Sequence, residues 1–478
     1  MHLIMDGFPK ELTLQAKASE HELVDEVRTS PMGRSINDIP PELLAIILKH
    51  AQQSRSCLYA ACLVNSYWRA IAQPLLFDGW SEFSSPMCDQ PKHMLGYIRS
   101  LLDRPDLAAS VTTICSDNCF EDSYDLGGHD PPDPDLLERV LEAAECHQPG
   151  NEDWKTAISE RRHDSALALM LYLLPRLTCL NLTISSCDDP WLSHWIMMFA
   201  RQNSSQGSPT TSPFLRELQV IRAQHWDTEN GFGMEDIAPL LMLPNLHTVE
   251  VHALGYCYVP AGETWPVRSS KVRLLRLEES GMEAEAFELL LSTFEALEVL
   301  EWHWGTACQT DANVDVPEIG NTLRRHGKSL QRLVIDVTES FWFQYEDLNT
   351  DTIGSLAHMT LLKSITLHTV FLTGKDDVDD DEYDSEPLHF ADVFPRALEE
   401  LNLIGTTLRL PQYLLDMARK CAFAFPKLKV VRCQAWDRTD LAVDVEMVRQ
   451  AFEAAGVSFM SFDFKHVYLS RSFFEVVG

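Results

Sequence analysis

The sequence has few basic residues and no long apolar run. Lysine and arginine total 39 against 71 aspartates and glutamates, which gives a formal net charge of −32 at pH 7. A field of that sign repels nucleic-acid phosphates and anionic lipids, so neither nucleic acid nor a membrane is expected as a direct partner. No apolar stretch reaches the length of about 18 residues that a transmembrane helix needs.

The twelve cysteines include no C-x-x-C pair. Cys115 and Cys119 lie four residues apart, but no second pair or histidine follows at zinc spacing, so no structural zinc is expected. The opening residues MHLIM are too short for a signal-peptide core and are followed by Asp6. We therefore expect a reducing compartment, the cytoplasm and/or the nucleus, with most cysteines acting as small core residues.

Motifs of catalysis are missing as well. The chain has no phosphate-binding glycine loop, no G-x-S-x-G and no H-E-x-x-H. The best nucleophile pair is His303 with Cys308, but a histidine between two tryptophans at a strand end is more typical of packing or surface recognition. We expect no catalytic residue, no cofactor and hence no enzyme, with this pair as the alternative to test.

An acidic segment, residues 374–387, contains Asp377, Asp379 and Asp381 at a spacing similar to that of a calcium loop. The glycine and the terminal glutamate that such a loop needs are absent, so no metal is expected there. Runs of like charge are typical of solvated, disordered segments. Residues 1–35 are also polar and without a long period, and we expect a disordered leader.

Residues 36–80 have a different character from the rest of the chain. Two prolines, Pro40 and Pro41, fit the first turn of a helix, and apolar residues then recur at helical spacing. A second helix is predicted from Leu58 to Ile71, with Pro74 helping to end it. A unit of this size cannot bury so much apolar surface against itself, which predicts a partner for it.

This segment, IPPELLAIIL…LYAACLVNSYWRAIAQPLLF, resembles an F-box in the form common in fungal proteins. It opens with apolar-Pro-x-Glu-Leu at residues 39–43, with isoleucine in place of the usual leucine, and an apolar helix follows. The remaining matches are Cys62, Val64, Trp68, Arg69, Pro74, Leu76 and Phe77. The resemblance covers about 40 residues and implies docking on a Skp adaptor. By analogy, the docking residues are Ile39, Pro40, Pro41, Leu43, Leu44, Ile47, Val64 and Trp68.

From residue 81 to 478 a six-residue form, apolar-x-x-apolar-x-apolar, recurs every 25–38 residues, with helical patterns in many of the gaps. Proline precedes four copies by two residues, which ends a helix and favours extended backbone. The copies begin at Leu177, Leu215, Leu246, Val272, Leu297, Leu330, Leu362, Leu398, Leu428 and Val457, with a degenerate one at Val111. The pattern predicts an α/β fold, an irregular leucine-rich-repeat-like solenoid with a curved parallel sheet.

The residues between the apolar marks are expected on the concave face of that sheet. They mix both signs of charge, with Trp304 and Trp226 nearby, and this mixture suits protein recognition, although any exposed strand face would be polar. Arg276 and Arg332 are candidates to bind a phosphate. The candidate target-binding residues are Glu250, His252, Arg276, Glu278, Glu301, His303, Arg332, Asp336 and His368.

An F-box followed by leucine-rich repeats implies the substrate receptor of a Skp–cullin–F-box ubiquitin ligase. The adaptor would dock on the helical unit and an unidentified target protein on the repeat sheet. A non-ligase interaction scaffold with the same two parts is the alternative, and the sequence does not separate the two.

Overall fold

The main body of the protein is one sheet of parallel strands stacked in chain order. The computed structural model describes residues 39–51, 54–81, 90–116, 134–147, 151–160, 162–184, 215–225, 231–256, 265–305, 315–338, 352–374, 389–405, 407, 409–434 and 442–462. Twelve strands form the sheet: β1 Gly79–Ser81, β2 Thr113–Ser116, β3 Cys179–Ile184, β4 Val220–His225, β6 Thr248–His252, β8 Leu274–Glu278, β9 Val299–His303, β10 Arg332–Asp336, β11 Ser364–His368, β12 Glu400–Ile404, β13 Val430–Gln434 and β14 Ser458–Phe462. A separate pair joins β5 Phe232–Gly233 to β7 Leu254–Tyr256.

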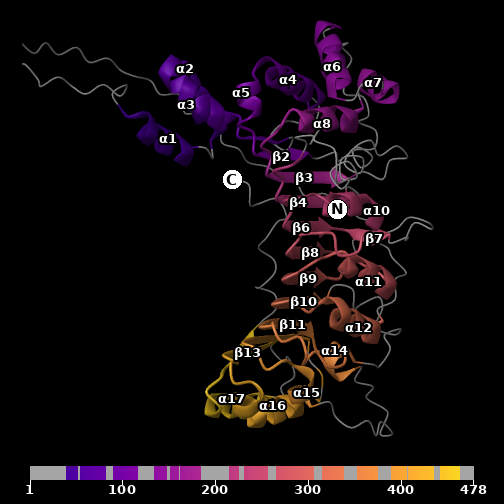
Figure 1. The fold of residues 1–478 in the computed structure, drawn as a ribbon. Helices are drawn as coiled ribbons and strands as arrows, with labels where there is room; N and C mark the ends of the chain where they lie inside the picture. Colours follow the sequence, from indigo (N-terminus) through magenta and orange to yellow (C-terminus); the bar gives the residue numbers. More distant parts are fainter. Residues whose placement is uncertain are drawn as a thin grey trace, which may run out of the picture.

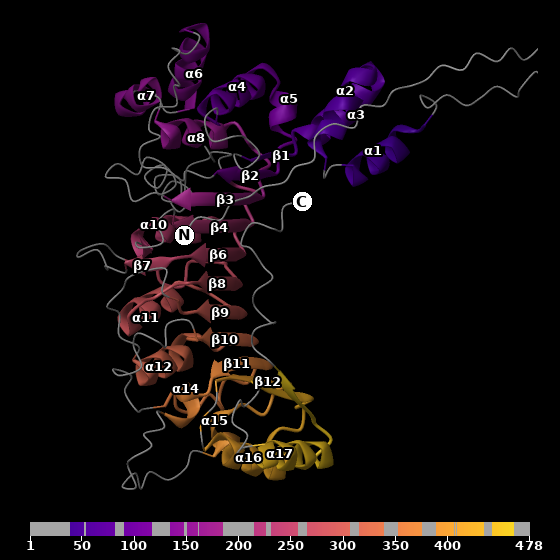
Figure 2. The same cartoon turned by 180° about the vertical axis from the view of Figure 1, so that it is seen from behind.

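Helices connect the strands, because parallel neighbours need a crossover. They are α4 Gln90–Asp103, α5 Pro105–Ala108, α6 Pro134–His147, α7 Glu152–Ser159, α8 His163–Tyr172, α10 Met234–Leu241, α11 Ala284–Ser292, α12 Val316–His326, α14 Val370–Thr373, α15 Phe390–Val393, α16 Leu410–Ala424 and α17 Ala442–Ala454. Figures 1 and 2 show α10, α11 and α12 stacked as a column along one side of the sheet. The stack bends at its β14 end, so that α16 and α17 lie towards the opposite side.

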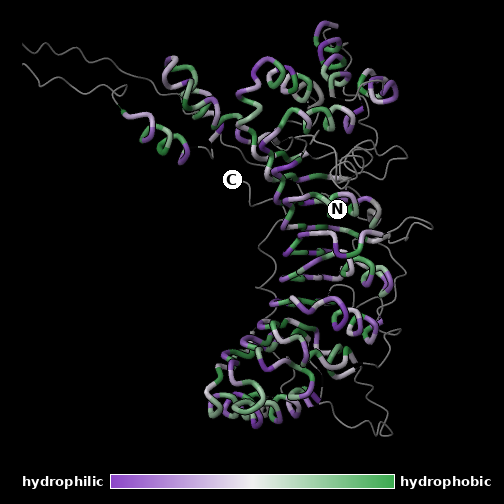
Figure 3. Tube along the Cα trace, in the orientation of Figure 1, coloured by the Kyte–Doolittle hydropathy of each residue, from purple (hydrophilic) through white to green (hydrophobic). Residues whose placement is uncertain are grey.

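Alternation of apolar and polar residues explains why these segments form strands. In β4 the exposure of successive residues alternates between half-buried and buried, and β6, β8 and β13 repeat this. The parallel register places Leu275, Leu300, Leu333 and Ile365 side by side on consecutive strands, and all four are fully buried. The tube in Figure 3 shows the same alternation along the sheet. One apolar row per strand thus forms a continuous core that runs the length of the stack.

The prediction of an α/β fold with a stacked parallel sheet is confirmed. A strand occurs at each of the ten expected copies, and β2 occurs at the degenerate one. Sequence analysis did not predict β1, which consists of three residues and begins at Gly79. The sheet therefore starts inside the segment that was assigned to the helical unit.

Three helices precede the sheet: α1 Pro41–His50, α2 Arg55–Val64 and α3 Ser66–Leu76. The predicted second helix is two helices, because Asn65 ends α2 in an extended conformation and its side-chain oxygen accepts a hydrogen bond from the Trp68 N–H at 2.9 Å. The prediction that Pro74 ends the helix is wrong, since Pro74 lies inside α3. A proline inside a helix removes one backbone hydrogen bond and crowds the carbonyl four residues earlier, and α3 continues for only two residues beyond Pro74.

The three helices have a small core of their own. Leu44, Leu48, Leu58 and Ala72 are buried together, apart from the main core. The Tyr67 hydroxyl donates to the Ile39 carbonyl at 2.6 Å, which ties α3 to the start of α1. Figures 1 and 2 show that the unit projects from the β1 end of the sheet, on the side away from α10, α11 and α12. We call α1, α2 and α3 the helical unit.

A short connection holds the helical unit to the sheet. Arg55 Nη2 donates to the Gly79 carbonyl at 2.6 Å. The Phe77 ring stacks on Tyr97 of α4, with centroids 5.7 Å apart, and Tyr97 stacks in turn near Trp80 of β1. These contacts hold Phe77, which directly follows α3, against β1 and α4.

Some expectations concern residues outside the described part of the chain. The leader, residues 1–35, lies outside it, and so does all of the acidic segment after Gly374. Within the described ranges no helix is both long and apolar enough to cross a membrane. The seven described cysteines are free thiols; four are buried, whereas Cys57 and Cys146 are exposed.

Two adjacent leucines on α1 should differ sharply in their effect on stability. Leu44 is fully buried and Leu43 is 54% exposed. We expect Leu44→Ala to cost about 2–5 kcal/mol, because it leaves a cavity in the small core, and Leu43→Ala to cost less than about 0.5 kcal/mol. Hydrogen exchange of the α2 and α3 amides measures the effect within the unit. Equal protection in the two variants would contradict the placement of Leu44 inside.

Candidate functional site

The outer surface of the helical unit is unusually apolar. On α1, Leu43, Ile46 and Ile47 are exposed to 54%, 55% and 52%, although Leu44 and Leu48 of the same helix are buried. Residues three and four apart share a helix face, so α1 has one apolar face inside and a second one outside. Of the eleven exposed large apolar side chains among the described residues, six lie between residues 43 and 64.

The structure divides the adaptor-binding candidates into two groups. Pro40, Pro41, Leu43, Ile47 and Val64 are exposed and available to a partner. The others face inward: Leu44 is in the small core, and Ile39 and Trp68 are half-buried against it. Sequence reasoning missed three exposed residues, Ile46, Tyr59 and Leu63.

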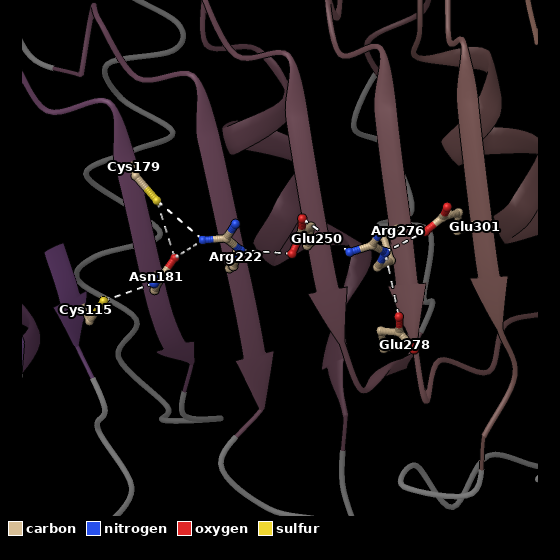
Figure 4. Close-up of polar contacts among 8 residues, drawn as sticks. All are labelled: Cys115, Cys179, Asn181, Arg222, Glu250, Arg276, Glu278 and Glu301. Atoms are coloured by element: carbon tan, nitrogen blue, oxygen red, sulfur yellow. Dashed lines mark hydrogen bonds and ion pairs between the residues drawn. The ribbon is translucent and has the colours of Figure 1, made fainter. Parts of the chain in front are cut away.

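A second surface is the polar face of the sheet, opposite its apolar row. Its central register row carries alternating charges on adjacent strands, shown in Figure 4 with the helices behind the strands. Arg222 Nε lies 2.9 Å from Glu250, and Glu250 is 3.5 Å from Arg276 Nη1. Arg276 Nε is 2.6 Å from Glu301, whose other oxygen is 2.9 Å from Arg332 Nε. We call these five residues the charge ladder.

Strand spacing accounts for the alternation. Side chains in one register row lie about 4.8 Å apart, where like charges would repel one another. Arg276 also approaches Glu278 at 3.8 Å, so three carboxylates surround this guanidinium. Burial alone lowers the pKa of Arg276, but Glu301 and the other two carboxylates raise it overall. The ladder is therefore an internally neutralised structure rather than an open cationic site.

The β2 end of this row is closed by neutral groups. Asn181 Nδ2 donates to Cys115 Sγ at 3.0 Å, and its side-chain oxygen accepts from Arg222 Nη1 at 3.5 Å (Figure 4). Burial raises the pKa of the Cys115 and Cys179 thiols, so both remain protonated at neutral pH. A protonated thiol is a poor nucleophile, and these two cysteines serve as weak hydrogen-bond partners.

The next register row alternates histidine and carboxylate along β6, β8, β9, β10 and β11: His252, Glu278, His303, Asp336 and His368. The Glu278–His303 adjacency follows from the same parallel pairing. His303 Nδ1 lies 3.7 Å from the Asp336 carboxylate.

The pKa values along this row diverge. Burial lowers the pKa of His303, but Asp336 and Glu278 raise it overall. Burial lowers the pKa of His252. Burial also lowers the pKa of His368, to about 4, although Asp336 acts in the opposite direction. Burial raises the pKa of Glu278, whereas the contacts of Asp336 with His303 and Thr338 outweigh burial and lower its pKa.

All nine predicted target-binding residues thus lie on one face of the sheet. Glu250, Arg276 and Glu301 belong to the charge ladder, and Arg332 joins it from the start of β10. The suggestion that Arg276 binds a phosphate stays a prediction, and the three carboxylates that already engage this guanidinium argue against it. Arg332 is half-exposed, at 51%, but is also paired.

One further expectation about this face is wrong, and another concerns residues outside the described part of the chain. Trp304 was expected beside the target surface, but it is 3% exposed and packs on Trp302 with centroids 5.1 Å apart. Trp226 and Cys308 lie outside the described residues, so the proposed His303–Cys308 pair is not tested. Sequence reasoning missed Arg222, because the copy that begins at Leu215 takes Val220 as an apolar mark, whereas the buried residues of β4 are Ile221 and Ala223.

No group of three or more histidine, cysteine, aspartate or glutamate side chains is placed to hold a metal ion in the described ranges. A comparison of the chain with known protein-family models finds no match. A comparison with curated proteins also finds no similar protein.

His368 should make the stability of the sheet depend on pH. Its side chain is half-buried, and a side chain added at Gly405, whose φ is +75°, would meet the ring at 2.5 Å. The Val370 N–H approaches Nδ1 at 3.4 Å, which requires an unprotonated nitrogen there. The folded-state pKa of about 4 is below the ordinary value of 6.5, so the unfolded chain binds the proton more tightly and stability falls as the pH drops through this window.

Between pH 7 and pH 5 this histidine should cost the folded state about 2 kcal/mol. We expect His368→Asn to reduce the pH dependence of the free energy of unfolding by that amount, measured by tryptophan fluorescence in denaturant. His358→Asn, the same substitution at an exposed histidine of the segment before β11, is the control variant. An unaltered slope in the His368 variant would show that this ring is not the titrating group.

Proposed function

We propose that this chain is the substrate-recognition subunit of a Skp–cullin–F-box ubiquitin ligase. The helical unit docks the Skp adaptor, and the repeat sheet holds a target protein. The observation that carries the proposal is the second, outward apolar face of α1, formed by Leu43, Ile46 and Ile47. The F-box resemblance of residues 39–77 supports the same assignment.

The energetics favour a partner on this face. Soluble proteins rarely leave large apolar side chains clustered on one short helix. Covering a half-exposed leucine or isoleucine recovers about 1 kcal/mol, so the three α1 residues together account for a binding contribution of about 3 kcal/mol. Tyr59, Leu63 and Val64 add similar apolar area on α2.

The polar face of the sheet suits a protein target. Its charges are mixed, and two less buried members, Arg332 at 51% and Glu278 at 32% exposure, lie at the margins of a neutralised ladder. Holding a target near a ubiquitin-conjugating enzyme raises its effective concentration, and such a receptor needs no acid, base or nucleophile of its own. This function places the chain in the cytoplasm and/or the nucleus.

The outward face of α1 can be tested without disturbing the core. We expect Leu43→Ala/Ile47→Ala to weaken binding of the full chain to purified Skp adaptor about thirtyfold, because roughly 2 kcal/mol of apolar burial is lost. Val267→Ala/Leu361→Ala is a matched control, because these side chains are 63% and 50% exposed and lie outside the helical unit, in the segments that precede β8 and β11. Isothermal titration calorimetry measures both. Adaptor affinity unchanged in the α1 variant would refute docking through this face.

Co-purification separates the ligase from a non-ligase scaffold. The full chain should recover both adaptor and cullin, whereas recovery of adaptor without cullin supports the scaffold. A variant lacking residues 36–76 keeps Phe77 and β1, so the first rung of the sheet remains. We expect it to lose the adaptor and retain other partners, and retention of the adaptor would overturn the assignment of the helical unit.

A further inference from the structure

One repeat is basic although the chain as a whole is acidic. Residues 396–432 contain seven lysines and arginines and three aspartates and glutamates, a local charge of +4 (7 minus 3) in a chain of −32. This repeat comprises β12, α16 and the start of β13, at the end of the sheet remote from the helical unit (Figures 1 and 2).

The charges concentrate where the chain enters β11, β12 and β13. Lys363 directly precedes β11, Arg396 lies in the turn before β12, and Lys427 and Lys429 lie in the turn before β13. All four side chains are exposed, Lys429 to 73%. Phe423, in the last turn of α16, is 82% exposed, the most exposed of the large apolar side chains in the described ranges. We call these five residues the basic patch.

Among the residues that the structure describes, Glu399 is the carboxylate that pairs with the lysines of the basic patch. Glu399, which precedes β12, pairs with Lys429 at 2.5 Å. Its backbone is hydrogen-bonded to Lys363 on one side and Lys429 on the other, which places it between the two strands' entries. The pKa of Glu399 is lowered by Lys429 first and then by Lys363 and Lys427. Three lysines therefore share one carboxylate, in contrast to Arg276, which three carboxylates share.

Phe423 adds an apolar side chain to the basic patch. The Arg396 guanidinium lies over its ring, 5.7 Å from the centroid, so a cation flanks an aromatic surface. The entries to β11 and β13 are two strand spacings apart, about 10 Å, which three residues of extended chain can span. A segment that carries several carboxylates and one apolar side chain matches this combination of cations and an exposed ring.

We propose that the basic patch binds an acidic, extended segment of a partner protein, with its carboxylates at Lys363, Lys427 and Lys429 and an apolar side chain on Phe423. This interaction goes beyond the proposed function, which assigns target binding to the polar face of the sheet, and it holds whether or not the helical unit binds an adaptor. A short segment fits better than a nucleic acid, because charges are screened beyond about 8 Å at physiological salt and a long polyanion would extend over the acidic remainder.

The test uses the full chain and a fluorescein-labelled peptide of glutamates with one central phenylalanine, followed by fluorescence anisotropy. We expect Lys427→Glu/Lys429→Glu to raise Kd about tenfold or more at low salt, and added salt to weaken wild-type binding. Phe423→Ala should raise Kd about fivefold, through the lost apolar contact. Lys427→Gln/Lys429→Gln provides a second variant that removes charge without adding repulsion.

Arg176→Glu/Arg216→Glu is the matched control. Both arginines are exposed in the turns before β3 and β4, so the variant makes the same change at equivalent positions near the other end of the sheet. It should bind the peptide as the wild type does. The proposal is overturned if the lysine variants bind normally, if the control weakens binding equally, or if a lysine peptide or a single-stranded DNA of equal charge binds as tightly as the glutamate peptide.

Discussion

No repeat of this protein can bury its strand alone, and the rest of the structure follows from that constraint. Each strand contributes one apolar row, and only the strands and helices of neighbouring repeats cover it. Leu275, Leu300, Leu333 and Ile365 are fully buried because the parallel register aligns them. The same register fixes what faces the solvent, since every residue between two buried ones must lie on the other face.

The residues that alternate with the buried row form the polar face of the sheet. At a spacing of about 4.8 Å, neighbouring side chains in one row cannot carry like charges without loss of stability. Arg222, Glu250, Arg276 and Glu301 alternate accordingly and neutralise one another. A partner therefore meets a preorganised surface in which the central charges are already engaged, and its specificity depends on the less engaged groups at the margin. The basic patch differs because two lysines, Lys363 and Lys429, flank the single carboxylate of Glu399, and Lys427 in the adjacent turn adds a third positive charge.

Much of the fold could be predicted because stacking requires the same pattern of apolar residues in each repeat, and this pattern can be seen in the sequence. The six-residue form and its preceding prolines located β3, β4 and the later strands of the main sheet. β1 could not be recognised in this way, since a strand of three residues is shorter than the six-residue form. The break at Asn65 was missed because an apolar stripe continues across it, and only the capping geometry shows where α2 ends.

The candidate sites were predictable in type but not in detail. Strand parity placed Glu250, Arg276 and Glu301 on the correct face, but it could not show that they pair with one another. Helical periodicity identified α1 as apolar, yet it could not show which of Leu43 and Leu44 faces inward, because both adjacent faces are apolar. Trp304 was misjudged for a related reason: residues just past a strand end do not follow the strand's alternation.

The short connection between α3 and β1 gives the molecule a fixed geometry. Arg55 donates a hydrogen bond to the Gly79 carbonyl, and Phe77 stacks on Tyr97. A subunit bound to α1 would therefore have a defined orientation relative to β1. From there the distance to any later strand is a whole number of strand spacings. A repeat inserted or deleted in the stack would shift a cargo on β12 or β13 by about 4.8 Å and rotate it by the twist of one strand pair, roughly 20°. The number of repeats thus sets both the distance and the orientation of a bound protein relative to α1, in discrete steps.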